Sequence, residues 1–130
     1  MIVYLESSAA MKLLRLESET IALRQYCDRV VESGDVLLTA ALTETELRRA
    51  AQRWNRPQES VTAILDRLDV ADMERAVFTA AGVLSGPHLR SLDALHVAAA
   101  LYLNAEVLVS YDRRQIEAAA ANGIRTVSPA

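Results

Sequence analysis

The sequence predicts an α/β fold in which a short parallel sheet is covered by helices. Short apolar runs rich in β-branched residues alternate with longer segments whose apolar residues follow helical spacing. Parallel strands require crossover connections of this kind, and right-handed crossovers place helices on both faces of the sheet. With 52% apolar and 24% charged residues, the composition is that of a globular chain. We therefore expect a three-layer α/β/α arrangement in a single domain spanning residues 1–130.

The first two thirds of the chain begin with a strand and are then mostly helical. Residues 2–5 form a continuous apolar run, which is typical of a buried parallel strand. Glu6 follows this run, and Ser7 and Ser8 are suitable N-terminal caps for a helix. Residues 39–43 are expected to form a turn or a short lead-in to the next helix. The expected strands of this part are 2–5, 36–38 and a short or edge segment at 69–71, and the expected helices are 9–16, 18–32, 44–54, 59–68 and 72–84.

The last third returns to regular alternation. Residues 85–87, Ser-Gly-Pro, predict a loop, and Asn122-Gly123 predicts the end of the last helix. The expected elements of this part are a helix at 92–103, a strand at 106–109, a helix at 112–121 and a strand at 124–127.

Composition excludes several classes of protein. No apolar run approaches the roughly 18 residues of a membrane span, and the N-terminus lacks the basic segment of a signal peptide, so we expect a cytoplasmic protein. Cys27 is the only cysteine, which excludes an internal disulfide and a cysteine metal cluster, and its apolar surroundings predict a buried thiol. The net charge of −3 argues mildly against a constitutive nucleic-acid binder. Lys12 is the only lysine, however, and the arginines that supply the remaining positive charge suit phosphate binding.

Carboxylates follow nearly every predicted strand. Glu6 follows the first strand, Glu46 lies early in the helix after the second, Asp93 opens a later helix, and Asp112 follows the strand at 106–109. In an open α/β sheet, ligands bind beyond the carboxyl ends of the strands. Four carboxylates in one cleft would repel each other unless a cation lay among them, and Mg²⁺ and Mn²⁺ prefer such oxygen ligands. A metal held in this way can activate water and neutralise charge on a phosphodiester.

Four segments, taken in order, carry a family resemblance: MIVYLESSA, LTETELRRA, SLDALHVAAAL and VLVSYDRRQ. Together they resemble PIN-domain ribonucleases, and more narrowly the VapC-type toxins of bacterial toxin–antitoxin pairs. The resemblance covers essentially the whole chain. It implies a Rossmann-like α/β/α PIN domain, RNA cleavage that depends on Mg²⁺ or Mn²⁺, a homodimer, and inhibition by a cognate VapB-type antitoxin.

The resemblance also implies roles for individual residues. Glu46, Asp93 and Asp112 match acids of the family motifs, and Ser8 and Ser110 match their hydroxyl positions. The expected catalytic set is therefore Glu6, Ser8, Glu46, Asp93, Ser110 and Asp112, with the four acids as metal ligands.

Two positions depart from the family pattern. Glu6 stands where the family has aspartate, and its additional methylene displaces the carboxylate, which predicts reduced activity because Mg²⁺ geometry is strict. Arg114 stands where many relatives have a further acid. The alternative interpretation is a catalytically weak PIN-like protein that binds RNA or an antitoxin.

Several of these residues also have structural explanations. Thr43 and Glu46 have the spacing of a capping box, and Asp93 and Asp112 suit helix N-termini. Ser8 and Ser110 are equally suitable as capping or loop hydroxyls. His96, one turn into an apolar helix, is more typical of a packed histidine than of a catalytic base.

Surface charge supplies the expected RNA contacts. Arg113 and Arg114 adjoin Asp112, and Arg48 belongs to an arginine-rich helix, so these three are the predicted RNA-binding residues. The same arginines also suit an ion-paired, solvated face. Glu44 is expected to be a solvated neighbour of Glu46, and His88 a solvated loop residue.

Three other functional classes lack their required residues. A phosphoacceptor receiver domain needs a lysine at a late strand end, but Lys12 lies far too early. A haloacid-dehalogenase-type phosphatase needs Asp-x-Asp after the first strand, where this chain has Glu6-Ser7-Ser8. A nucleotide-binding module would have a glycine-rich loop at the same place.

Overall fold

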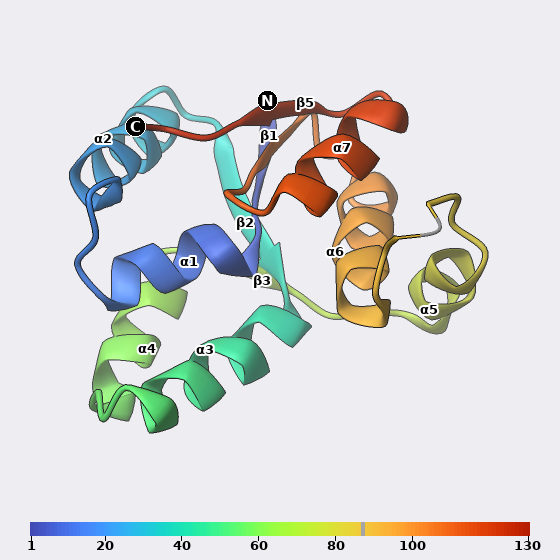
Figure 1. The fold of residues 1–130 in the computed structure, drawn as a ribbon. Coiled ribbons are helices and arrows are strands. Elements are labelled where there is room, and N and C mark those ends of the chain that lie inside the picture. Colours follow the sequence, from blue (N-terminus) through green and yellow to red (C-terminus); the bar gives the residue numbers. More distant parts are fainter. Residues whose placement is uncertain (87) are drawn as a thin grey trace.

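The computed structural model describes residues 1–86 and 88–130, and its centre is a five-stranded parallel sheet (Figure 1). The order β3-β2-β1-β4-β5 places the first strand in the middle, so the chain builds outward in one direction and then in the other. The strands are β1 (Ile2–Leu5), β2 (Val36–Ala40), β3 (Asp69–Ala71), β4 (Val107–Val109) and β5 (Arg125–Val127). The predicted α/β class with a short parallel sheet is confirmed.

Seven helices connect these strands in the described part of the chain. They are α1 (Ser7–Leu14), α2 (Thr20–Glu32), α3 (Ala41–Arg53), α4 (Gln58–Leu65), α5 (Arg75–Gly82), α6 (Ser91–Tyr102) and α7 (Arg113–Ala121). In Figure 1, α1 to α4 lie on one side of the sheet and α5 to α7 on the other. The helices connecting β1, β2 and β3 therefore form one layer, and most of the later helices form the opposite one.

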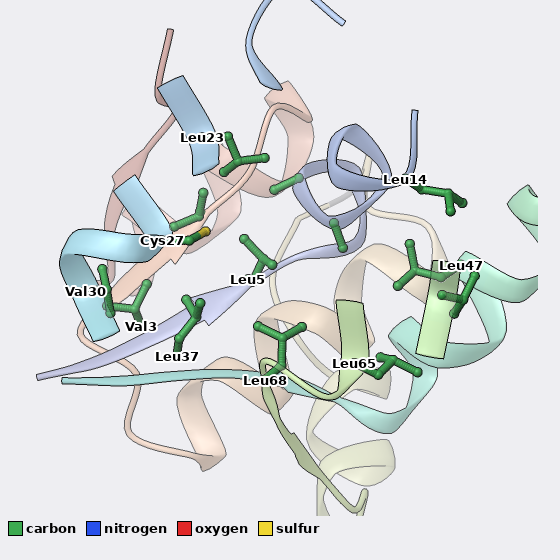
Figure 2. Packing of buried hydrophobic residues seen from close by; sticks show 14 of the residues in the cluster. Val3, Leu5, Leu14, Leu23, Cys27, Val30, Leu37, Leu47, Leu65 and Leu68 are labelled. Atoms are coloured by element: carbon green, nitrogen blue, oxygen red, sulfur yellow. The ribbon is translucent and has the colours of Figure 1, made fainter. Parts of the chain in front are cut away.

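Alternation along β1 divides the core into two clusters. Val3 and Leu5 point to the layer of α1 to α4, where they pack with Leu23, Leu37 and other side chains shown in Figure 2. Tyr4 points to the opposite layer, into a cluster rich in alanines, four of which belong to α6. Each fully buried leucine contributes roughly 1.5–3 kcal/mol of hydrophobic free energy. The small alanine side chains instead bring α6 close to the sheet, which places a helix N-terminus beside the strand ends.

The start of α3 differs from the sequence prediction. Residues 39–43 were expected to form a turn or a short lead-in to the helix, but β2 continues to Ala40 and α3 begins at Ala41 without a loop. The two β-branched threonines that suggest a turn bond to each other instead, with Thr39 Oγ1 and Thr43 Oγ1 2.7 Å apart. The capping-box interpretation of Thr43 and Glu46 is therefore wrong, because both residues lie inside the helix.

Other boundaries shift by smaller amounts. Helix α1 begins at Ser7 rather than Ala9, and its N-cap is Glu6 rather than a serine. Helix α4 ends at Leu65, where residues 66–67 form a turn. Helix α5 is confined to Arg75–Gly82, because residues 72–74 have no regular structure and Val83 forms a turn. Ser85 and Gly86 lie outside helices and strands, as predicted for the loop, whereas Pro87 lies outside the described residues.

Two predictions from composition can be compared with the structure. Cys27 is buried in the core, as expected, and burial raises the pKa of its thiol to about 11. Among the described residues, no helix is both long enough and apolar enough to cross a membrane.

Candidate active site

The middle of the sheet brings the first strand and a late strand to a common edge. β1 pairs in parallel with β4, with Leu5 opposite Val109, so the next residues, Glu6 and Ser110, are neighbours. β1 is also where the strand order reverses, which is the usual ligand position in open α/β sheets. Two sequence-predicted residues separated by more than 100 positions thus meet at the expected place.

Glu6 is the most completely bonded carboxylate of the site. It is 2% exposed and accepts hydrogen bonds from Ser7 Oγ (2.7 Å), Ser8 N (2.9 Å), Ser8 Oγ (2.5 Å) and Ser110 Oγ (2.6 Å). The additional methylene of glutamate lets the carboxylate curl back over the first turn of α1 and act as its N-cap. Three of these donors bond Glu6 alone, and the fourth, Ser7 Oγ, is also within reach of Glu46, so most of the lone pairs of Glu6 are engaged with the protein.

The two predicted hydroxyls, Ser8 and Ser110, lie together beside Glu6. Their Oγ atoms are 3.3 Å apart, and Ser8 Oγ also accepts the N–H of Tyr111 at 2.9 Å. Ser110 Oγ accepts the N–H of Asp112 at 3.0 Å. These serines therefore join the ends of β1 and β4 by direct side-chain contacts.

Glu46 reaches the site from α3 and is held by a histidine. Its Oε1 lies 2.7 Å from His96 Nε2, and the other ring nitrogen, Nδ1, lies 2.8 Å from the hydroxyl of Tyr4. A carboxylate only accepts hydrogen bonds, so Nε2 must carry the hydrogen toward Glu46. Burial raises the pKa of Tyr4, so its phenol keeps its proton and can donate to Nδ1 when the ring hydrogen is on Nε2. A hydrogen-bonded series thus runs from the sheet to Glu46.

His96 is a packed, buried histidine, as predicted, but its contact with Glu46 was not predicted from the sequence. It is 1% exposed, and its ring meets that of Tyr4 edge-on at 5.9 Å. The signal in the sequence was its spacing: His96 follows Asp93 by three residues, and such residues share one face of a helix. The position that orients Asp93 toward the sheet therefore orients His96 as well.

Ser7, also missed, lies between two carboxylates. Its Oγ is 2.7 Å from Glu6 Oε2, 3.1 Å from Glu46 Oε2 and 3.2 Å from His96 Nε2. A hydroxyl has one hydrogen to donate, so it satisfies only one of the two acids at a time. Two carboxylates within reach of a single donor favour a cation between them. The oxygen-rich donor set here fits a hard divalent cation such as Mg²⁺ or Mn²⁺.

Asp93 lies near the N-terminus of α6, largely buried at 8% exposure. Its Oδ2 accepts a hydrogen bond from the backbone N–H of Arg90 at 3.2 Å. Asp93 therefore stabilises the N-terminus of α6, which was the structural role considered for it from the sequence. Its Oδ1 lies 3.5 Å from Nε2 of Gln115 on α7. Gln115 is itself buried, and its Oε1 has no hydrogen-bond partner among the residues described. An acceptor without a donor therefore lies beside Asp93.

Asp112 is the N-cap of α7. Its Oδ1 accepts the N–H of Arg114 at 2.9 Å, which confirms the capping role considered from the sequence. A single such bond occupies only part of the carboxylate. Capping and ligand binding are therefore compatible for Asp112, because helix capping uses one of its two oxygens.

The predicted set gathers in two parts. Glu6, Ser8 and Ser110 are in direct contact, and Glu46 joins them through Ser7. Asp93 and Asp112 lie at the N-terminal ends of α6 and α7, which pack against each other. Within residues 1–86 and 88–130, no three carboxylate, imidazole or thiol groups form a ready-made metal-binding cluster. Much of the reason is Glu6, whose oxygens turn toward α1 and the serines.

The three arginines predicted to bind RNA have different environments. Arg48 is held between α3 and α4 by Glu44 Oε2 (2.8 Å), Gln58 Oε1 (3.1 Å) and Thr62 Oγ1 (3.3 Å). Its partner Glu44 is thus the solvent-facing neighbour expected from the sequence. Arg113 and Arg114 are exposed at the start of α7, and Arg113 pairs with Glu117 at 3.5 Å.

The fold and these strand-end acids define a small α/β protein with a carboxylate-rich candidate active site. The sequence profile of the PIN domain family matches residues 3–121, so the chain belongs to the PIN domain family. Curated relatives include ribonuclease VapC35 of Mycobacterium tuberculosis, which is 38% identical over 133 residues that cover 98% of this chain and 96% of that protein. Ribonuclease VapC47 of the same species is 34% identical, with the same coverage of each chain.

Solved structures show the same fold. The match to "VapBC2 from Rickettsia felis bound to a DNA fragment from their promoter" covers 100% of both chains, with a TM-score of 0.77 and 16% identity. Mycobacterium tuberculosis VapC20, described as a "Sarcin-Ricin loop cleaving toxin", covers 98% of this chain and 99% of its own, with a TM-score of 0.71 and 14% identity. The Rossmann-like PIN architecture expected from the sequence is confirmed.

Proposed function

We propose that this protein is a divalent-metal-dependent endoribonuclease that acts as the toxin of a toxin–antitoxin pair. The observation that carries the proposal is the meeting of Glu6 and Glu46 around Ser7 at the end of β1, beside the helix ends that bear Asp93 and Asp112. The names of the curated relatives, which are ribonucleases, support RNA as the substrate.

The site residues would have two kinds of role, binding of the metal ion and orientation of the carboxylates. Glu46, Asp93 and Asp112 would hold Mg²⁺ or Mn²⁺, with Glu6 as the fourth acid. Such an ion supplies an activated water and stabilises charge on a phosphodiester oxygen. His96 donates to Glu46 and fixes its direction, while Ser8 and Ser110 fix Glu6. No side chain of this set needs to act as a covalent nucleophile.

Glu6 is the reason to expect a slower enzyme than an aspartate would give. Its four protein hydrogen bonds compete with any ligand for the same lone pairs. The alternative function is that of a weak catalyst that binds RNA or an antitoxin. In that case Glu6 would keep its protein hydrogen bonds and would not bind a metal ion. Calorimetric titration with Mn²⁺ separates the two, since a catalytic site binds the ion and the alternative binds it weakly or not at all.

A VapB-type antitoxin is the expected protein partner, together with a homodimeric state. Solved structures with this fold are described as VapBC complexes, including "VapBC-1 from nontypeable Haemophilus influenzae". The sequence resemblance to VapC-type proteins points to the same partner.

The decisive experiment is cleavage of structured RNAs by the purified protein with and without Mn²⁺. Asp112→Asn keeps a good helix cap and Asp93→Asn keeps the shape of the side chain, so both variants should fold while kcat falls at least about 100-fold. Asp28→Asn, an exposed acid remote from the strand ends, is the matched control and should cleave normally. Equal rates for the two site variants and the parent would refute the assignment.

A further inference from the structure

A second feature adjoins the two aspartates: a surface hollow whose lining includes two arginines. Its volume is about 450 Å³ and its lining consists of His88, Arg90, Arg114 and Glu117. A neighbouring hollow of about 200 Å³ shares three of these residues and extends along α7. We refer to the four-residue lining as the basic hollow. Neither His88 nor Arg90 was predicted from the sequence to take part in a site.

The two arginines of the basic hollow have guanidinium groups that are available to a ligand. Arg90 is 73% exposed, and its Nε lies 3.8 Å from Asp93, a long and solvated contact that contributes little stability. Arg114 is exposed, and its guanidinium forms no ion pair with any residue in the described part of the chain. By contrast, Arg48 already has three side-chain partners.

The charge of the lining is unbalanced. Glu117 is its one acid, and Glu117 is shared with Arg113, which lies outside the lining, at 3.5 Å. Two exposed guanidinium groups, of which only that of Arg90 has a long contact with an acid among the described residues, therefore place local positive charge on a chain whose net charge is −3. Guanidinium groups present a planar fork of N–H donors that matches phosphate oxygens.

The position of the hollow links it to the candidate active site. Arg90 donates its backbone N–H to Asp93, and Arg114 donates its backbone N–H to Asp112. Each of these two guanidinium groups therefore belongs to a residue whose backbone N–H is hydrogen-bonded to one of the two aspartates. An anion held by both arginines would lie directly beside these carboxylates.

We propose that the basic hollow binds backbone phosphates of the RNA strand next to the bond that is cut, with Arg90 and Arg114 as the phosphate ligands and His88 as an additional donor. The proposal rests on the proposed function for the choice of RNA. An acidic segment of a partner protein is the other anionic candidate. RNA is favoured because all four lining residues of the basic hollow are polar or charged, and the apolar Leu89, Ala118 and Ala121 belong to the neighbouring hollow. The centre of a protein–protein interface is typically apolar and poor in charge.

The test measures RNA binding apart from cleavage. A labelled single-stranded RNA is titrated with the parent, Arg90→Gln and Arg114→Gln in EDTA by fluorescence anisotropy, at several salt concentrations. Each lost phosphate contact should reduce the slope of log affinity against log salt by about 0.7. The weakening of RNA binding between about 50 and 200 mM salt should therefore be about 2.6-fold smaller for each arginine removed.

Three further variants make the result specific. Arg67→Gln removes the same charge from an arginine that pairs with Asp28 and lines a different cavity, and it should keep the parent slope. Arg90→Lys and Arg114→Lys keep the charge, so they should keep most of the slope while losing the fork geometry.

Unchanged slopes in both glutamine variants would overturn the proposal. The proposal would also be overturned if the parent protein bound polyglutamate through these arginines but did not bind RNA through them. That result would assign the hollow to an acidic protein partner. Cleavage of RNA by the parent in Mn²⁺ is scored separately. Absence of cleavage with an altered slope would refute the nuclease function alone, whereas cleavage with an unaltered slope would refute the hollow alone.

Discussion

His96 Nε2 lies 2.7 Å from Glu46 Oε1, and this contact connects an acid of the candidate active site to the buried side of the sheet. Behind His96 stands the hydroxyl of Tyr4 at 2.8 Å, on the face of β1 opposite Val3 and Leu5. Glu46 is itself only partly buried, at 19% side-chain exposure. Its direction is therefore set from the interior by a fully buried pair rather than by its own packing.

Tyr4→Phe should loosen Glu46 without removing any group of the site itself. Loss of the hydroxyl leaves His96 Nδ1 as a buried acceptor without a donor, which costs roughly 1–3 kcal/mol of the free energy of unfolding. If the imidazole also turns, kcat for RNA cleavage falls while KM stays near the parent value, because Glu46 is misdirected rather than lost. Thermal unfolding and steady-state kinetics together measure both effects.

The complementary change is His96→Gln, which retains a donor that can reach Glu46. The glutamine variant should retain more of the parent kcat than His96→Ala does. If the ring only filled space, the two variants would not differ in this way. Equal kcat values for the glutamine and alanine variants would show that His96 only fills space.

Glu6→Asp should raise both Mn²⁺ affinity and kcat. The shorter side chain still caps α1 through the N–H of Ser8, but it cannot keep all four of its present hydrogen bonds, so carboxylate lone pairs become available. We expect an increase of at least about tenfold in kcat, equivalent to about 1.4 kcal/mol in the barrier. Glu59→Asp, an exposed glutamate on α4, provides the matched shortening and should change neither quantity.

Gln115→Leu tests the acceptor beside Asp93 that lacks a donor. A buried polar atom without a partner is destabilising, and a leucine of similar size removes it, so the free energy of unfolding should rise by about 1 kcal/mol. The same change removes the Gln115 contact to Asp93 Oδ1, so Mn²⁺ should bind less tightly. A destabilised variant would mean that Gln115 Oε1 has a donor in solution, such as a buried water.

Cys27 makes the stability depend on alkaline pH. Burial raises the pKa of its thiol from 9.0 to about 11, so the unfolded chain loses this proton at a lower pH than the folded one. The contribution is fully present below pH 9 and is lost as pH rises toward 11, a total of about 2–3 kcal/mol. Urea unfolding at a series of pH values should show this loss, and Cys27→Ala should flatten it. A parent and variant with parallel pH curves would contradict the assignment to Cys27.

The sequence predicted those parts of the fold that depend on local patterns. The strand at Ile2–Leu5 was found because a short, wholly apolar run is suited to a strand buried on both faces. The start of α3 was predicted incorrectly, because Thr39 and Thr43 favour turns and caps locally but are buried as a bonded pair in the folded chain. Packing between the strand and the helix overrode the local preference.

The candidate site was predictable in its membership but not in its contacts. Strand-end position and family resemblance named Glu6, Glu46, Asp93 and Asp112, and their metal-binding role remains a prediction. The inward curl of Glu6 depends on Ser110, more than 100 residues away, and no local pattern reports such a pairing. Ser7 and His96 were missed for the same reason, since their roles arise from partners on other elements.

The central place of β1 has a consequence for synthesis of the protein. β1 is synthesised first, but it pairs with β4, which is synthesised late. Ser110, which donates a hydrogen bond to Glu6, is the residue that directly follows β4. Asp93 and Asp112 likewise arrive on α6 and α7, late in the chain. A ribosome must therefore release almost the whole polypeptide before the acids can assemble. A growing chain that is still attached to the translation machinery carries Glu6 and Glu46 without their later partners, so a nuclease built in this order stays inactive while it is being made.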